Sequence, residues 1–374
     1  MGRKDPKQKS EKGRIGHTRR SAHERGRKLK KTSRACALLL AAALPLSLSA
    51  CGSSASENGE VYVYNWGEYI DQDLISQFEK ETGIKVVYNT FETNEGLYAK
   101  LQTESYDVII PSDYMIARMI DEDMLQPLDY SKIPNMELID SAYTHLEFDP
   151  DQAYSVPYTW GVVGVIYNTE KVDETDIGSW DLLWNEKYAG ETAMFDNSRD
   201  ALGVALKYLG YSQNTTDENE LREAANLIVE KKEIFQGFFM DQVLEKLPNE
   251  ELVAAPYYNG DAVTMMEENE SLAFYVPEEG TNLFVDAMCI PANAKNVDNA
   301  HAFINFMCSA DAALATTEYI GYSSPNMGAI EQLDDEVKND PLYYPSTENT
   351  ETFLNLPEET NELYTALWTE ILKD

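Results

Sequence analysis

The chain is poor in the residues on which many enzymes and metal sites depend. Its 374 residues include 4 histidines and 4 cysteines. Beyond residue 51 only His145 and His301 remain, and no nucleophile-elbow, zinc-binding, phosphate-loop or dinucleotide-binding motif is present. His301 lies one position off the apolar face of a predicted helix, so we expect a structural role. Cys289 and Cys308 are expected to be buried free thiols, with a disulfide between them as the alternative. No metal-binding spacing, cofactor motif or catalytic residue is identified.

Arginine is equally scarce in the same region. Only Arg118, Arg199 and Arg222 follow residue 51, and the first and last lie on predicted helices among acidic neighbours. Binding sites for carboxylate, sulfate or phosphate groups commonly use a guanidinium fork. Arg199 lies at a helix start, where pairing with Asp196 or Asp200 is the simpler expectation. An anionic ligand is therefore disfavoured.

Residues 1–50 differ in composition from the rest. They hold 14 of the 30 Lys and Arg residues and 3 of the 65 Asp and Glu residues, and end in the apolar run CALLLAAALPLSLSA. A basic start, a short apolar run and small residues predict a secretory signal peptide. The sequence LSAC at 48–51 resembles the lipobox of bacterial lipoproteins. That resemblance implies cleavage before Cys51, a lipid on its thiol, and an extracytoplasmic, membrane-anchored protein at the cell surface or in the periplasm.

The remainder of the chain is strongly acidic. Its formal charge is near −46, compared with −35 for the whole sequence. Such a body repels nucleic acid and anionic lipid and attracts cationic ligands over a distance. A well-solvated surface explains most of these charges whatever the function. We therefore expect no nucleic-acid partner.

Strands and helices are predicted to alternate after a Gly, Ser and acidic tether at 51–60. The first series runs from residue 61 through the apolar strand YDVIIP, and a second begins at VPYTWGVVGVIYN. This alternation predicts an α/β fold with a parallel sheet flanked by helices. Two such series without an internal repeat of 20–50 residues indicate two lobes.

Aromatic residues stand beside carboxylates at several predicted strand ends. All 40 Phe, Trp and Tyr residues follow residue 51. Taken singly, each is more often part of a core than of a site. Ligand sites in open α/β sheets lie beyond the carboxyl ends of strands, where we expect Trp66, Tyr114 and Asp286. Rings beside acids at that edge suit a ligand that is both cationic and apolar.

The chain resembles the spermidine/putrescine-binding lipoproteins of ATP-driven polyamine importers. The resemblance is carried, in the family's order and across most of 61–374, by YNWGEY, ETGIKVVY, YAKL, YDVIIPSDY, VPYTWG, LGYSQNTTD, IPANAKN, INFMCS and IGYSSPN. It implies a two-lobed type II periplasmic-binding-protein fold with a ligand cleft between the lobes, and an ABC permease as partner. We expect one lobe to comprise 61–163 with 285–325, and the other 164–284 with 326–374.

The resemblance also implies which residues contact the ligand. Carried over position by position, they are Trp66, Glu68, Tyr69, Ser112, Tyr114, Asn197, Asp200, Tyr258, Phe284, Asp286 and Tyr322. Methylenes of a polyamine favour flat rings and its ammonium groups need carboxylates. We expect Asp286 to be the principal anchor, with Glu68 and Asp200 receiving the other nitrogens. Asn197 is neutral where an acid is often found, which leaves the choice between putrescine and spermidine open.

Two alternatives remain at this point. The same scaffold can bind another small cationic solute or act as a sensor. An anchored hydrolase is the other alternative, although chance pairs of carboxylates are common in so acidic a chain.

Overall fold

The computed structural model describes residues 58–373. The predicted signal peptide at 1–50, the lipid site at Cys51 and most of the tether at 51–60 lie outside the described residues. Within 58–373, no helix combines the length and the apolar character that crossing a membrane requires.

The described strands form a sheet in the order β2-β1-β3-β9-β4-β7-β5-β6, with β10 beside β9 and β8 beside β4. Their bounds are β1 Glu60–Trp66, β2 Lys85–Phe91, β3 Val108–Ile109, β4 Ser155–Asn168, β5 Thr192–Phe195, β6 Phe235–Phe239, β7 Ala254–Tyr258, β8 Leu272–Tyr275, β9 Thr281–Cys289 and β10 Thr350–Glu351.

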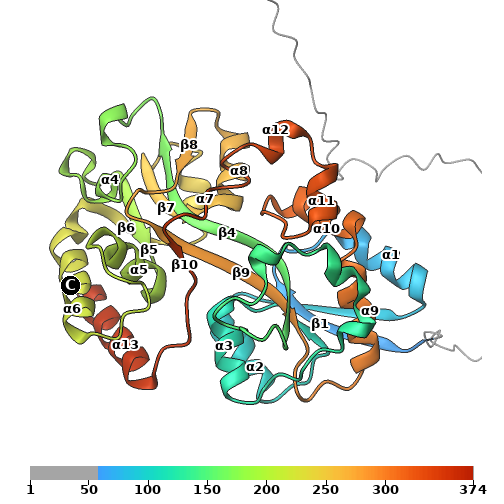
Figure 1. Ribbon diagram of the computed structural model, residues 1–374. Helices are drawn as coiled ribbons and strands as arrows, with labels where there is room; N and C mark the ends of the chain where they lie inside the picture. The colour runs from blue at the N-terminus through green and yellow to red at the C-terminus, as the bar shows by residue number, and fades with distance from the viewer. Residues whose placement is uncertain (1–57, 374) are drawn as a thin grey trace, which may run out of the picture. The chain divides into compact units, whose positions relative to one another are not determined.

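The prediction of a parallel sheet is only partly right. β1 pairs in parallel with β2 and β3, and β5 with β6 and β7. β9, however, pairs antiparallel with β3 and β4, and β4 pairs antiparallel with β7 and β8. Two long strands of opposite direction, β4 and β9, therefore join two parallel groups, and both run through the middle of the molecule in Figure 1.

Helices surround the sheet (Figure 1). They are α1 Gln72–Thr82, α2 Asn94–Leu101, α3 Asp113–Asp121, α4 Asp181–Trp184, α5 Ser198–Tyr208, α6 Glu218–Lys231, α7 Val243–Lys246, α8 Asn259–Glu268, α9 Val297–Met307, α10 Ala310–Ile320, α11 Met327–Gln332, α12 Asp335–Lys338 and α13 Glu358–Leu372. α1 shows why local sequence sets such bounds. Asp71 accepts a hydrogen bond from the Asp73 N–H at its start, and Gly83 ends it with a φ of 70°.

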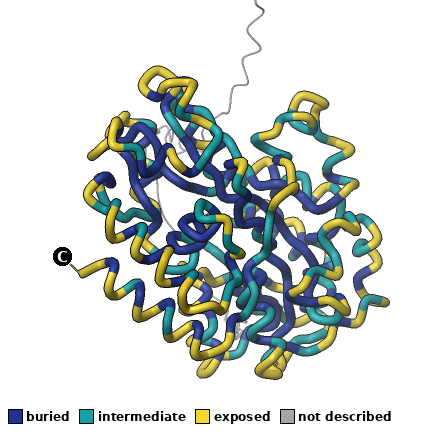
Figure 2. Tube along the Cα trace, turned by 60° about the vertical axis from the view of Figure 1, so that its left-hand side comes forward, coloured by how far each residue is buried: buried dark blue, intermediate teal, exposed yellow. Residues whose placement is uncertain are grey.

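Buried apolar residues gather in separate clusters on the two sides of β4 and β9. One cluster packs α4, α5, α6, α8 and α13 around β4, β5 and β7 and includes Trp180 and Phe195. Two others pack the region of β1–β3, α1–α3 and α9 and include Phe78 and Ile109. Strands β4 and β9 are almost entirely buried. Figure 2 shows buried stretches running through the interior of the trace and exposed turns on its outside.

The expectations for the buried thiols and His301 are confirmed. Cys289 and Cys308 are both buried and free. His301 is buried, accepts a hydrogen bond from the Asp129 N–H at Nε2 and contacts the Val297 carbonyl oxygen through Nδ1 at 2.7 Å. Its ring therefore ties α9 to the loop at residue 129.

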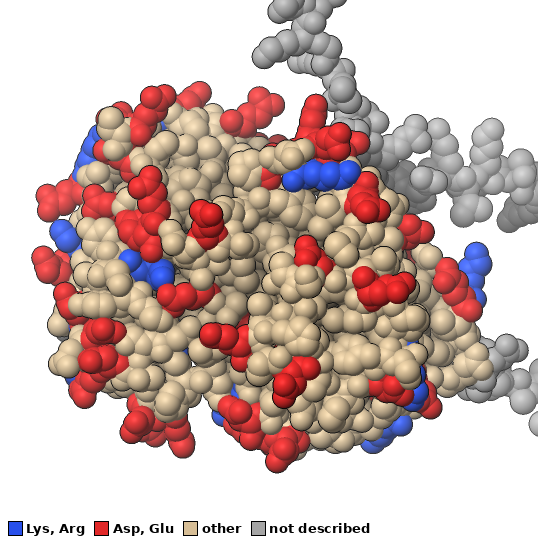
Figure 3. All heavy atoms as spheres, viewed as in Figure 1, with Lys and Arg blue, Asp and Glu red and all other residues tan. Residues whose placement is uncertain are grey.

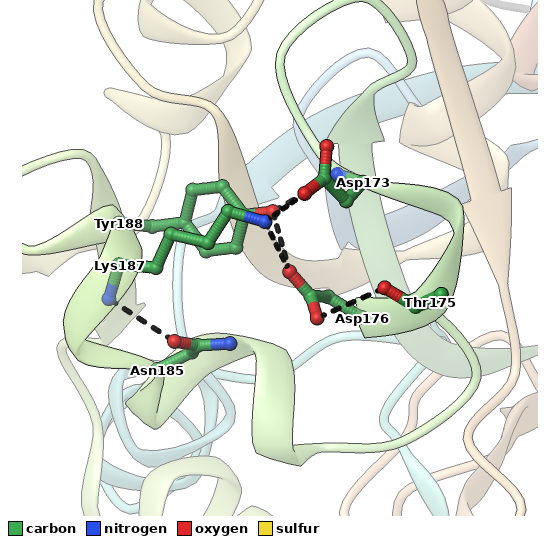
Figure 4. A network of polar contacts seen from close by, with 6 residues as sticks. All are labelled: Asp173, Thr175, Asp176, Asn185, Lys187 and Tyr188. Atoms are coloured by element: carbon green, nitrogen blue, oxygen red, sulfur yellow. Dashed lines mark hydrogen bonds and ion pairs between the residues drawn. The ribbon is translucent and has the colours of Figure 1, made fainter.

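The segment around α4 is joined to residues 173–176 by a polar network on the surface (Figure 4). Lys187 forms ion pairs with Asp173 and Asp176, and the Tyr188 hydroxyl donates to Asp176 and accepts from the Asp173 N–H. These are exposed pairs, so the network fixes the path of the loop more than it adds to the free energy of unfolding.

Charge on the face seen in Figure 3 is mostly negative, with acidic side chains spread over it and few basic ones. This distribution agrees with the acidic composition beyond residue 51 and provides the long-range attraction for cations that the sequence predicted.

A substitution at Gly164 in β4 tests how closely β4 packs against β8. A Cβ there would lie 2.5 Å from the carbonyl oxygen of Tyr275 and would also collide with the ring of Phe274. We expect Gly164→Ala to lower the free energy of unfolding by about 1–3 kcal/mol, because backbone must move to make room. Gly67→Ala is the control, since no atom lies within 4 Å of its Cβ. Urea unfolding measures both, and equal stability of the two variants would contradict the packing argument.

Candidate functional site

The loop that follows β1 carries three of the predicted residues in different settings. Trp66 ends β1 and packs against Phe91 at 4.5 Å between ring centroids, and its indole Nε1 is buried without a partner. Glu68 has a φ of 51°, is exposed, and accepts a hydrogen bond from the Tyr319 hydroxyl at 2.8 Å. Tyr69 faces the interior instead. The loop therefore separates a surface acid from an inward phenol.

Asp286 is the most deeply buried acid of the predicted set, with 4% of its surface exposed. The prediction that it lies at a strand end is wrong, since it pairs with Thr159 of β4 and bridges Ser112 in the interior of β9. The Tyr69 hydroxyl donates to Oδ2 at 2.5 Å, and Oδ1 is buried with no partner. Burial raises the pKa of Asp286 to about 6, and the neighbouring Tyr69 and Ser112 side chains oppose that rise.

Four aromatic rings follow one another from Asp286 and are called the ring row below: Tyr69, Tyr322, Phe284 and Tyr258. Tyr69 and Tyr322 lie 5.8 Å apart, Tyr322 and Phe284 5.8 Å, and Phe284 and Tyr258 5.5 Å, measured between centroids. All three contacts are edge-to-face, an arrangement that aromatic rings favour.

Two glycines make room for the ring row. A Cβ at Gly260 would lie 2.5 Å from the ring of Tyr322, and one at Gly161 would lie 2.5 Å from Phe284 Cζ and from Asn259 Oδ1. Because no other residue lacks a Cβ, both rings depend on glycine for their position.

Asp200 lies at the other end of the ring row, half-buried in the first turn of α5. The Tyr258 hydroxyl donates to Oδ2 of Asp200 at 2.9 Å, and Asn197 Nδ2 donates to the same oxygen at 2.6 Å. Asn197 also caps α5, because its Oδ1 accepts from the Asp200 N–H at 2.8 Å. Burial raises the pKa of Asp200, and the hydrogen bonds from Asn197 and Tyr258 oppose that rise.

Ser112 and Tyr114 are placed by an asparagine that sequence reasoning missed. Asn94 Nδ2 lies 3.1 Å from the Ser112 hydroxyl and 3.2 Å from the Tyr114 hydroxyl. The Tyr114 hydroxyl in turn donates to Glu95 Oε1 at 3.0 Å. Asn94 and Glu95 begin α2, after the short connection of Glu92 and Thr93 that follows β2. A search for polar residues just beyond strand ends could therefore have identified them.

The structure thus joins most of the predicted set by direct contacts. Tyr69, Ser112, Phe284, Asp286, Tyr322, Tyr258, Asp200 and Asn197 form one connected group, and Asn94 links Tyr114 to it. Trp66 and Glu68 make the contacts described for them with Phe91 and Tyr319 instead.

Two further residues belong to this group. The Thr159 hydroxyl lies 2.9 Å from that of Tyr69, and Asp261 accepts a hydrogen bond from the Tyr322 hydroxyl at 2.6 Å. Burial raises the pKa of Asp261 to about 6. Thr159 could not be identified as a site residue from the sequence, because its partner Tyr69 lies 90 residues away in the chain.

The expected ion pair of Arg199 with Asp196 or Asp200 is wrong. The guanidinium lies 4.4 Å from the centroid of the Phe353 ring, and its Nη2 contacts Asn214 Oδ1 at 3.3 Å and the Leu354 carbonyl oxygen at 3.5 Å. Stacking on a ring and bonding to neutral oxygens replaces the local pairing.

Known proteins resemble the chain over most of its length. The family described as bacterial extracellular solute-binding protein matches residues 73–345. The spermidine/putrescine-binding periplasmic protein of Escherichia coli is 39% identical over 314 residues, which cover 83% of this chain and 90% of that protein.

Solved structures agree. The substrate-binding protein of the spermidine/putrescine ABC transporter of Streptococcus pneumoniae is 39% identical with a TM-score of 0.77, covering 84% of this chain and 98% of that chain. A Treponema pallidum lipoprotein is 29% identical with a TM-score of 0.76, covering 83% and 99%. The fold expected from the sequence, a two-lobed solute-binding fold, is confirmed by these structures.

The raised pKa of Asp286 predicts how stability depends on pH. Its pKa is about 6 in the folded protein against an ordinary value of 3.8. Between these values the folded state holds a proton that the unfolded chain has released, so this group adds stability as the pH falls. From about pH 7.5 to about pH 5, we expect wild type to gain about 1 kcal/mol more in free energy of unfolding than Asp286→Asn.

Urea unfolding of the ligand-free proteins at the two pH values measures this difference. The exposed Asp151 provides a control, since Asp151→Asn should follow wild type. An identical pH dependence in Asp286→Asn and wild type would show that Asp286 titrates normally.

Proposed function

Because this chain belongs to the bacterial extracellular solute-binding proteins, we propose that it captures a polyamine, putrescine or spermidine, and delivers it to the permease of an ABC importer. The observation that carries this proposal is the free Oδ1 of Asp286, which is buried without a partner beside the ring row. A buried carboxylate oxygen of this kind is suited to an ammonium donor, since an unpaired buried charge is costly.

The ring row supports a ligand with methylenes between its charges. Flat ring faces bury methylenes, and a cation over a ring contributes about 0.5–2 kcal/mol. Asp286 lies at one end of the row and Asp200 accepts a hydrogen bond from Tyr258 at the other. Two carboxylates separated by aromatic rings match the alternation of charge and hydrocarbon in a polyamine. We infer binding without turnover as the role of this site.

The proposed ligand set keeps the residues carried over from the resemblance. Asp286 anchors one primary ammonium and Asp200 receives another nitrogen. Glu68 is exposed and accepts a hydrogen bond from Tyr319, so we place it at the rim of the site. Trp66 offers a half-buried ring next to that rim.

We also propose that two lobes close over the ligand. One would comprise 61–163 with 285–325 and the other 164–284 with 326–374. The separate hydrophobic clusters on the two sides of β4 and β9 support this division. Closure around the ligand would create the surface that the permease recognises, by a shift of population toward the closed state.

Titration calorimetry and thermal shift with putrescine, spermidine, choline and arginine test the proposed ligand. We expect a polyamine to bind and to stabilise the protein by about 2.7 kcal/mol at about a hundredfold excess over Kd. Asp286→Ala should abolish the shift, because the ammonium loses its buried partner. Lys187→Met is the matched control, since it removes a surface ion pair of the loop in Figure 4 and should bind normally.

Two outcomes would contradict the proposal. Choline or arginine binding in place of polyamines would favour the same scaffold with another cationic ligand. Normal polyamine binding by Asp286→Ala would show that the anchor lies elsewhere.

We propose further that the mature protein is lipid-anchored through Cys51. The basic, apolar and small-residue segments before LSAC support this, and the Treponema pallidum relative is a lipoprotein. Cys51→Ser cannot accept a lipid, so we expect the protein to leave the membrane fraction for the soluble extracytoplasmic fraction. Immunoblots of the fractions measure this. The two buried cysteines offer a control, because Cys308→Ala should remain with the membrane.

A further inference from the structure

Each phenol of the ring row donates its hydroxyl hydrogen to a different acid. The oxygen-to-oxygen distances are 2.5, 2.6 and 2.9 Å in the pairs Tyr69 with Asp286, Tyr322 with Asp261, and Tyr258 with Asp200. Asp286 and Asp200 are the acids proposed above to bind nitrogens of the ligand. Asp261 is the acid of the three that the proposed ligand set leaves without a role.

The start of α8 brings Asp261 to the ring row. Asp261 lies in the first turn of α8, and Tyr258 is the N-cap of the same helix. One helix start therefore supplies one ring of the row and the acid that binds another. Tyr258 and Tyr322 are the two ring neighbours of Phe284. The positions of both rings that flank Phe284 thus depend on this helix start.

Two glycines allow the start of α8 to approach the end of α10 closely. Gly321 ends α10 with a φ of 78°, and a Cβ there would lie 3.1 Å from the carbonyl oxygen of Gly260. A Cβ at Gly260 would lie 2.5 Å from the ring of Tyr322. The Tyr322 ring therefore packs against the backbone of Gly260, and its hydroxyl reaches the next residue, Asp261. The packing limits where the ring can lie, and the hydrogen bond fixes the direction of the hydroxyl.

The protonation of the two partners sets the direction of this hydrogen bond. Burial raises the pKa of Tyr322, and the negative charge of Asp261 raises it further, so the phenol keeps its proton and donates. The pKa of Asp261 is about 6, so at neutral pH its side chain is mostly a carboxylate, which only accepts. An amide oxygen at this position could accept the same bond, whereas a methyl group would leave a buried hydroxyl without a partner.

Building on the proposed function, we propose that Asp261 is a positioning residue that holds Tyr322 in the ring row, where the methylenes of the polyamine lie. Asp261 acts through Tyr322 and not as a charge that contacts the ligand. Tyr322 contacts both Tyr69 and Phe284, so a turn of this ring would interrupt the row at its middle. In the proposed division, Asp261 belongs to one lobe and Tyr322 to the other, so the bond also joins the lobes within the site.

Calorimetric titration of Asp261→Ala, Asp261→Asn and Tyr322→Phe with putrescine and spermidine tests this proposal. We expect Asp261→Ala and Tyr322→Phe each to raise the Kd for both amines by about three- to tenfold, because the bond that orients the ring is lost. Asp261→Asn should stay within about twofold of wild type, because its amide oxygen accepts the same bond. The losses of Asp261→Ala and Tyr322→Phe should be non-additive in the double variant. Glu268→Ala, which removes an exposed acid of the same helix, is the matched control and should bind normally.

The outcomes separate this proposal from the function on which it rests. Normal binding by Asp261→Ala, or additive losses in the double variant, would show that Asp261 does not act through Tyr322. If Asp261→Ala does not fold, the other two variants decide: weak binding by Asp261→Asn with normal binding by Tyr322→Phe would assign a charge role and overturn positioning. In each of these cases, polyamine binding by wild type still supports the proposed function. If wild type binds neither amine, both proposals fail.

Discussion

The whole site depends on the hydrogen bond from the Tyr69 phenol to the buried carboxylate of Asp286. Asp286 lies in β9, between β4 and the start of α3, and Tyr69 belongs to the loop after β1. The bond therefore ties that loop to the interior of the sheet. It satisfies one carboxylate oxygen and leaves the other buried without a partner, and the proposed cation site is built on that second oxygen. The ring row begins at the Tyr69 phenol, which contacts Tyr322 edge-to-face, and it continues through the remaining two rings.

Much of the fold could be predicted from local sequence. Asp71 and Gly83 bound α1 as expected, because capping and positive-φ preferences act over a few residues. The direction of β4 and β9 could not be predicted in this way. Their pairing joins Thr159 with Asp286, which lie far apart in the chain. The alternation of strands and helices does not indicate which distant strands pair or in which direction. The mixed sheet thus arises from long-range pairing and not from local propensity.

The site shows the same division between local and distant information. The position of Trp66 at the end of a strand could be predicted from the sequence. The sequence predicts Asp286 at a strand end, but the residue lies inside β9, where the neighbouring strand β4 helps to bury it. Arg199 was expected to bond with the nearest acids, and the structure places it on a ring more than 150 residues away in the chain, Phe353, so proximity in sequence was a poor guide.

The state of the two buried cysteines has a consequence for how the protein matures. Burial raises the pKa of the Cys308 thiol to about 12 and that of Cys289 well above its usual value, so neither is a reactive thiolate at neutral pH. The described part of the chain reaches its native packing without a covalent cross-link. Folding outside the cytoplasm therefore needs no thiol oxidase, and reducing agents leave the native body intact.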